Sequence, residues 1–533
     1  MKKLDIKYLW ILFIVLMFSC IDDDSKFGGV DIDEIKIEGI KDYQEIEWGG
    51  HLIVQPNVTT KFGDKSNLSF VWYKYNQEQS IADTLAYTKD LDVVINDVLP
   101  GVETTLTFKV IDNNTGVYSL YNSKFVTLGK YSGGTLMLYR NNGEIELGLL
   151  KKDGTTLYEN IFSQMNEGEK LGSASKRIIL TKNYPQNSLP YKAVVVTCDD
   201  PTGGVYLDAD AFIKKDIMKN KFVFGEDMTG NIVISGNYNN QSTEYLIVNG
   251  KVHGRAFGYS DRADWDPEIV FLSNPTEYAA AAFVAQPTDY PFYAAPVFYD
   301  NLNGRFMLNT NGGYFSSISG ENDDISKSDP SNVGKGIILV ASGSMNSSLN
   351  EIWALMKNTN SGEYMLLTYK FIYDFENRTY SFVSLSKQVI PTDKCPGLYA
   401  ATTFVPGTKQ LISSSYPWVM EAKGISDVLL YLSNNKVYAL NVHNVAEGVI
   451  VDGNQENYTL TTLDCTEVSW PTADDPNATI PQLTLGIIDQ SAGDKKAGIA
   501  TYKLDNIGGL SAHKLYAKTG FCDEVLFTIE KQE

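Results

Sequence analysis

The sequence is poor in the residues that most often build metal centres and catalytic bases. Its 533 residues include four histidines, at positions 51, 253, 443 and 513, and five cysteines. The histidines lie far apart and no two cysteines form a C-x-x-C pair, so neighbouring residues cannot supply a zinc site. The H-E-x-x-H, G-x-S-x-G and phosphate-loop motifs are missing as well. The sequence therefore predicts no cofactor, and it favours a protein that is not an enzyme.

Extended apolar runs are also scarce. The run from Tyr8 to Phe18 follows a basic start with Lys2, Lys3 and Lys7, and an acidic triplet at 22–24 comes soon after it. A run of this length is too short for a typical transmembrane helix, and its flanks are those of a secretory signal. We therefore expect residues 1–19 to be a signal peptide and the rest of the chain to be exported.

Positive charge is in deficit, because 45 lysines and arginines face 65 aspartates and glutamates, a formal net charge of -20. An acidic surface repels phosphate backbones, which argues against nucleic acid as a partner. Carboxylates are so common that no single pair identifies a glycosidase. The segments 208–210, 322–324 and 452–456 could hold structural calcium, but none has the full EF-hand spacing, so solvated loop acids are the expectation.

Four cysteines follow Cys20 at scattered positions, which are Cys198, Cys395, Cys465 and Cys522. Four cysteines allow three pairings, and the sequence cannot choose among them. We expect these residues to fill cores or to form at most one disulfide.

Residues 31–130 consist of short segments in which apolar and polar residues alternate. Examples are 51–55, 68–74, 91–95 and 105–110, separated by turn clusters such as 112–116. About seven short strands in a hundred residues, with a tryptophan in mid-strand, are typical of an immunoglobulin-like sandwich. In such a fold Trp72 is expected to pack against the opposite sheet rather than to bind a ligand.

A different repeat begins near residue 131. An apolar strand, a turn with Asn, Asp or Gly and a second strand recur with starts at 136, 194, 245, 297, 353, 428 and 485. The spacing is 51 to 58 residues except for one gap of 75, which predicts a β-propeller of about seven blades over residues 131–533. Six or eight blades, or a row of further sandwich domains, are the alternatives.

Two further expectations concern the predicted propeller. The last strand, 525–529, is expected to close the ring against a strand near 125–128 or 136–139, since closure removes exposed edges. Short helical pieces, such as 275–281, are expected in loops.

Aromatic side chains are abundant, with 32 tyrosines, 24 phenylalanines and 7 tryptophans. Most are expected in cores, but rings in polar loop contexts can stack on sugars or accept peptide side chains. The candidate ligand-binding residues of this kind are Trp265, Tyr290, Phe292, Tyr293, Trp418 and Trp470.

Ser19-Cys20, at the end of the apolar run, resembles the lipobox of bacterial lipoproteins, and the acidic triplet resembles the surface-export signal of Bacteroidetes. Met17 and Phe18 depart from the strict lipobox pattern. The resemblance implies that Cys20 is lipidated and that residues 20–30 form a tether to the outer face of the outer membrane. The alternative is a cleaved signal that leaves Cys20 as an ordinary thiol.

The segment 49–52, the pair Trp72-Tyr73 and the strand 108–112 before a Thr-Gly turn resemble the PKD-like domain. With the lipobox and the C-terminal repeats, the chain resembles PKD-like family surface lipoproteins of Bacteroidetes, which are often associated with SusC/SusD-type uptake systems. The resemblance implies a non-enzymatic lipoprotein that binds extracellular glycans or peptides or helps deliver them to such a transporter. A propeller-type polysaccharide hydrolase or lyase, or a subunit that braces a transporter complex, are the alternatives.

Overall fold

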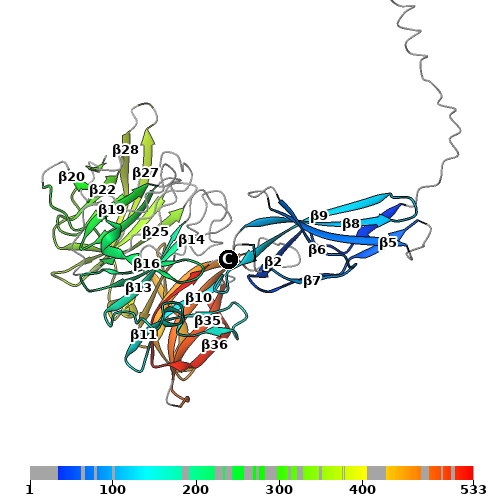
Figure 1. The fold of residues 1–533 in the computed structure, drawn as a ribbon. Helices are drawn as coiled ribbons and strands as arrows, with labels where there is room; N and C mark the ends of the chain where they lie inside the picture. The colour runs from blue at the N-terminus through cyan, green and yellow to red at the C-terminus, as the bar shows by residue number, and fades with distance from the viewer. Residues whose placement is uncertain are drawn as a thin grey trace, which may run out of the picture. The chain divides into compact units, whose positions relative to one another are not determined.

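The computed structural model of the chain divides into two compact units, Met1–Thr127 and Leu128–Glu533, and each is described by itself (Figure 1). The chain is all-β, as predicted. Among the described residues the helical elements are α2 (Ile161–Met165), α3 (Pro396–Tyr399) and the 3-10 turn η1 (Met218–Lys221). In this part of the chain no helix has the length and apolar character needed to cross a membrane. The structure describes residues 34–61, 67–76, 81–95, 97–98, 102–182, 191–222, 232–233, 243–256, 268–271, 275–281, 297–309, 314–320, 328–346, 351–374, 376, 379–401, 403–404, 428–469, 479–493, 496–505 and 510–531.

The described residues of the first unit, blue in Figure 1, form one five-stranded sheet and two strand pairs. The five-stranded sheet has the order β2-β9-β8-β5-β6, and the pairs are β1-β4 and β3-β7. The strands are β1 (Ile35–Glu38), β2 (Tyr43–Glu47), β3 (His51–Val54), β4 (Asn57–Thr60), β5 (Leu68–Asn76), β6 (Ile81–Ala86), β7 (Leu91–Val94), β8 (Glu103–Asp112) and β9 (Tyr118–Leu128).

The core of the first unit lies between the five-stranded sheet and the strand pairs. Trp72 of β5 is fully buried in it, and its ring stacks on Phe108 of β8 with 4.2 Å between centroids. The indole N–H donates to the carbonyl oxygens of Thr88 and Lys89, both at 3.1 Å. A buried indole needs such a partner for its N–H. Trp72 is therefore a core residue, as predicted.

In the part of the chain that the structure describes, the second unit contains seven sheets of three to five strands. The first three sheets, with strands in spatial order, are β12-β11-β10-β37 (Leu157–Tyr158, Glu144–Leu150, Gly134–Asn141, Glu524–Lys531), β13-β14-β15-β16 (Ser175–Lys182, Tyr191–Cys198, Gly204–Asp208, Lys214–Ile217) and β17-β18-β19 (Ile232–Val233, Thr243–Val248, Lys251–Ala256). The fourth and fifth sheets are β20-β23-β22-β21 (Val270–Phe271, Tyr314–Ser317, Arg305–Asn309, Val297–Asp300) and β24-β28-β27-β26-β25 (Ser319–Gly320, Thr379–Val389, Tyr364–Asp374, Glu351–Asn358, Ile337–Asn346). The sixth and seventh sheets are β29-β30-β31-β32 (Thr403–Phe404, Val428–Ser433, Lys436–Asn441, Ala446–Asp452) and β33-β34-β35-β36 (Tyr458–Ser469, Thr479–Asp489, Ala497–Asp505, Ser511–Cys522).

Each of the seven predicted strand-turn-strand repeats corresponds to one antiparallel hairpin in a sheet of its own. The turns explain the register. Asn142-Gly143 and Asn249-Gly250 have φ of 52°, 81°, 50° and 77°, all in the left-handed region. Two successive left-handed residues match the twist of the flanking strands, and Asn-Gly adopts this conformation at low cost.

The apolar clusters join these seven sheets in a cycle. Successive strand residues point to opposite sides, so Leu136 and Leu138 pack against the second sheet while Met137 and Tyr139 pack against the seventh. Five further interfaces of this kind join the remaining neighbours, from the second and third sheets to the sixth and seventh. Each sheet is therefore apolar on both faces, as buried sheets are.

The last strand completes the first sheet. β37 pairs antiparallel with β10, where Leu136 lies opposite Ile529. Figure 1 shows β10, in cyan, beside the orange and red strands of the C-terminal part. Of the two predicted partners for the last strand, 136–139 is correct.

Two expectations about smaller features can be compared with the structure. Residues 275–281 are not helical and form no regular element apart from an isolated bridge between Ala280 and Asp300. Long-range contacts hold this segment, since Ala279 N donates to the Asp300 carboxylate and Pro275 O accepts from Arg305. The four cysteines after Cys20 are buried and form no disulfide, so they fill cores.

Candidate functional site

The residues proposed from the sequence for lipidation and ligand binding all lie outside the described residues. They are Cys20, Trp265, Tyr290, Phe292, Tyr293, Trp418 and Trp470. The candidate sites that follow are therefore built from other residues.

One candidate is the outward side of the five-stranded sheet in the first unit, which we call the tyrosine face. Alternation along β5, β8 and β9 places Phe70, Trp72 and Phe108 in the core and the intervening residues outward. The pairing registers arrange the outward residues in four rows across the three strands. The rows are Ser69–Ile111–Tyr118, Val71–Lys109–Leu120, Tyr73–Thr107–Asn122 and Tyr75–Thr105–Lys124.

The tyrosine face exposes much apolar surface. Tyr118 is 56% exposed, Leu120 46% and Tyr75 37%, while Tyr73 and Val71 are half-buried. None of these five side chains belongs to the core cluster of the unit. Single exposed apolar residues need no explanation, but neighbours on one rigid sheet are typical of a binding surface.

The polar groups of the tyrosine face are held in place. Thr107 donates from Oγ1 to Oδ1 of Asn122 at 2.8 Å, directly across the β8–β9 pair. The Lys109 ammonium lies 4.4 Å from the centre of the Tyr118 ring, and Lys124 is paired with Glu103 at 2.5 Å. Both cations of the face are thus engaged within the sheet.

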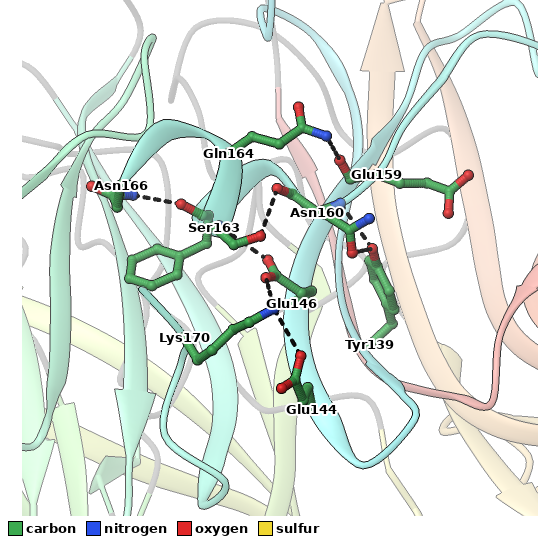
Figure 2. Close-up of polar contacts among 10 residues, drawn as sticks. Tyr139, Glu144, Glu146, Glu159, Asn160, Ser163, Gln164, Asn166 and Lys170 are labelled. Carbon is green, nitrogen blue, oxygen red and sulfur yellow. Dashed lines mark hydrogen bonds and ion pairs between the residues drawn. The ribbon is translucent and has the colours of Figure 1, made fainter. Parts of the chain in front are cut away.

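A second candidate is a carboxylate–lysine cluster in the second unit (Figure 2). Glu144 and Glu146 lie two residues apart on β11, so both project from the same side of the strand. The Lys170 ammonium lies 2.7 Å from Glu144 Oε2 and 3.6 Å from Glu146 Oε1. Glu146 is only 2% exposed, and its Oε2 accepts from Ser163 N at 3.4 Å. The hydrogen bond to Glu144 raises the pKa of Lys170, which keeps it charged.

The same cluster fixes the loop that carries α2. Asn160 precedes α2 in the left-handed conformation, and its side chain is bound to Tyr139 instead of capping the helix. Asn160 N also donates to the Tyr139 hydroxyl at 2.9 Å, as Figure 2 shows. Glu146 therefore takes the capping role through Ser163 N. An acidic group favours this end of a helix.

The geometry of the cluster is that of a clamp. A catalytic pair of carboxylates must reach a bond in the substrate and differ in protonation. Here one lysine lies between both groups as their shared cation, and Glu146 is closed off from solvent. The arrangement can hold the loop against β11, but it gives a substrate no access to Glu146.

A buried lysine lies where the last strand meets the first sheet. Lys531 is 2% exposed, its ammonium donates to Tyr131 O at 2.8 Å, and it lies 5.6 Å from the centre of the Phe212 ring. Burial lowers the pKa of Lys531 from 10.5 to about 8. Burial raises the pKa of the neighbouring Asp210. The two groups thus share a poorly solvated environment.

The candidate calcium loops that the structure describes use their acids locally. Asp208 Oδ1 accepts from the backbone N–H groups of Asp210 and Ala211, which is a turn contact. Asp452 pairs with Lys436 at 2.8 Å, and Glu456 pairs with Lys514 at 2.8 Å. Residues 322–324 lie outside the described part. In the described ranges no three His, Cys, Asp or Glu side chains gather as metal ligands would.

Comparison with known proteins gives one family match, in the N-terminal part. A model of the PKD-like family matches residues 20–174. This match supports the PKD-like resemblance seen in the sequence and extends it into β10, β11 and β12. Among curated proteins, none matches the chain.

Several solved structures are distantly similar. A quinonprotein alcohol dehydrogenase-like protein from Bacteroides thetaiotaomicron is 10% identical over 92% of this chain and 96% of its own, with a TM-score of 0.39. The extracellular domain of a one-component system from the same species is 10% identical over 89% and 69%, with a TM-score of 0.31. A dihydro-heme d1 dehydrogenase is 10% identical over 87% and 75%, with a TM-score of 0.30. TM-scores this low support no conclusion about the fold, so the description of the fold depends on the strand pairing and packing given above.

Proposed function

We propose that the protein is a non-enzymatic lipoprotein of the outer-membrane surface that binds extracellular glycans or peptides. In this proposal Cys20 carries the lipid, residues 20–30 form the tether, and the bound oligomer is helped toward a SusC/SusD-type transporter. The basic start, the apolar run and Ser19-Cys20 support export and anchoring.

The proposed architecture is a PKD-like sandwich over 31–130 followed by a seven-bladed propeller over 131–533. The cyclic packing of seven sheets supports the propeller, since each sheet would be one blade. The pairing of β37 with β10 supports a ring closed by the last strand. A closed ring leaves no long sheet edge, which suits an extracellular all-β protein.

The tyrosine face is the observation that carries the binding role. It presents exposed rings on a rigid sheet, with neighbouring polar groups that can orient a ligand. Trp265, Trp418, Trp470 and the aromatic residues of 290–293, chosen from their polar sequence contexts, are proposed as further ligand-binding residues. The clamp formed by Glu144, Glu146 and Lys170 supports a structural use of these carboxylates over a catalytic one.

The test is a binding screen with the full-length protein made without its acyl group by Cys20→Ser. Affinity electrophoresis against polysaccharides and calorimetry against peptide pools should show retention or heat with at least one pool. Release of shortened products would instead indicate a polysaccharide hydrolase or lyase. Failure to bind any pool would favour a subunit that braces a transporter.

A further inference from the structure

We infer that the tyrosine face binds a neutral oligosaccharide, which rests on the binding role proposed above and narrows it to one ligand class and one surface. The face belongs to the first unit, whereas the residues that the sequence singled out for ligand binding belong to the second. Its ligand class follows from the shape, the spacing and the charge of the face.

The rings of the face are spaced along an extended, flat surface. Tyr73 and Tyr75 project from the same side of β5, so their Cα atoms lie about 7 Å apart along the strand. Tyr118 stands on β9, two strands from β5 and three rows from Tyr75, so the two residues lie about 10 Å apart across the strands and about 20 Å apart along them. A chain of sugar rings can place its C–H faces on several such rings at once, since aromatic faces attract C–H groups.

Hydrogen-bonding groups lie among the rings. Thr107 donates to Oδ1 of Asn122, which leaves the Nδ2 end of that amide to donate to a ligand. Ser69 and Asn113 exchange hydrogen bonds of 3.0 Å and 2.8 Å at the end of the first row. Hydroxyl and amide groups held by their neighbours match the alternating hydroxyls of a saccharide.

The charges of the face argue for a neutral ligand. Its twelve residues include two cations and no carboxylate, and both cations are engaged, Lys109 over Tyr118 and Lys124 with Glu103. The whole chain carries a formal charge of -20, which repels acidic polysaccharides. A neutral glycan meets neither obstacle.

The backbone of the face argues against an extended peptide. Peptides that add to sheets bind through main-chain hydrogen bonds at an edge. β8 lies in the middle of the face, and its main chain is already paired with β5 and β9. Recognition here must use side chains alone, which suits a stacked sugar.

The test compares variants of the full-length Cys20→Ser protein in gels that contain dextran, mixed-linkage β-glucan, galactomannan or xylan. Calorimetry with oligosaccharides of the retaining polymer then gives the affinity. Tyr75→Ala/Tyr118→Ala should weaken binding about tenfold or more. Tyr118→Trp should keep it, because a larger flat ring still stacks. Tyr314→Ala, which removes a 49% exposed ring of β23 in the second unit, is the matched control. This variant should bind the polysaccharide as tightly as the protein without the Tyr314 change does.

The outcomes separate this inference from the proposed function. If a polysaccharide binds and the Tyr75→Ala/Tyr118→Ala variant binds it equally well, the face is not the site, although the binding role stands. If the double variant instead loses affinity for a peptide pool, the ligand class is wrong. If no neutral polysaccharide binds while polygalacturonan does, the charge argument fails. Absence of binding to every polysaccharide and peptide pool overturns both proposals.

Discussion

Thr135 donates a 3.0 Å hydrogen bond to Glu530 although 395 residues separate them in the chain. Both side chains are buried, and they join β10 to β37 at the point where the last strand completes the first sheet. The stability of the second unit should therefore depend on contacts between its two ends.

Thr135→Val tests this dependence. The change keeps the shape of the side chain and removes one donor from a buried carboxylate, which should cost about 1–3 kcal/mol of unfolding free energy. Denaturant titration gives the value. A loss below about 0.5 kcal/mol would show that the closing contact adds little.

Lys531 predicts a pH dependence of stability. Its pKa falls from 10.5 to about 8 on folding, so the folded state releases the proton first as the pH rises. The penalty for burying the charge is full below pH 8 and has disappeared above pH 10.5. Between pH 7 and pH 10 this group should add about 2–3 kcal/mol to the unfolding free energy.

Lys531→Met isolates this contribution, because other groups titrate in the same range. Burial raises the pKa of Cys198 and of Cys395 from 9.0 to about 11, which lowers stability above pH 9 in both proteins. The difference between Lys531→Met and the unmodified protein should shrink as the pH rises. A difference that stays constant from pH 7 to pH 10 would mean that Lys531 titrates normally.

Removing one partner of the buried ion pair between Asp300 and Arg305 should cause a large loss of stability. Both side chains are buried, Arg305 Nε lies 2.9 Å from Asp300 Oδ2, and the guanidinium lies 3.9 Å from the centre of the Phe271 ring. Arg305→Met should destabilise the second unit by about 3 kcal/mol or more, because Asp300 keeps a buried charge. Adding Asp300→Asn should recover part of that loss. Thermal unfolding of the single and double variants measures both effects.

The clamp on β11 predicts a contrast between two neighbouring carboxylates. Glu146→Ala should cost about 1–3 kcal/mol, since Ser163 N loses a buried acceptor. Glu144→Ala removes an exposed partner of the same lysine and should cost under about 1 kcal/mol. Equal losses of stability for the two variants would mean that the cluster stabilises the fold through the ion pairs of Lys170 and not through the buried carboxylate of Glu146.

Local signals in the sequence predict most of the fold. Period-two alternation and Asn-Gly turns locate the hairpins, because both act within a few residues. The irregular conformation of 275–281 could not be predicted in this way, since Arg305 and Asp300 hold this segment from a hairpin further along the chain.

The candidate sites were harder to predict. From Phe70 to Tyr73 every residue is apolar, so the sequence does not show which side of β5 is buried. Tyr73 and Tyr75 are two residues apart, so in a strand both project from the same side. This spacing is the signal that could have indicated the tyrosine face. The contact of Lys170 with Glu146 depends on the path of the α2 loop, which no local pattern specifies.

The anchoring of the protein outside the cell underlies the whole functional proposal, and protease treatment of intact cells tests it most directly. We predict that external protease removes the unmodified protein from cells whose periplasmic proteins stay intact. Cys20→Ala should no longer fractionate with the outer membrane. Protection of the unmodified protein from protease, or unchanged membrane association of Cys20→Ala, would contradict the account.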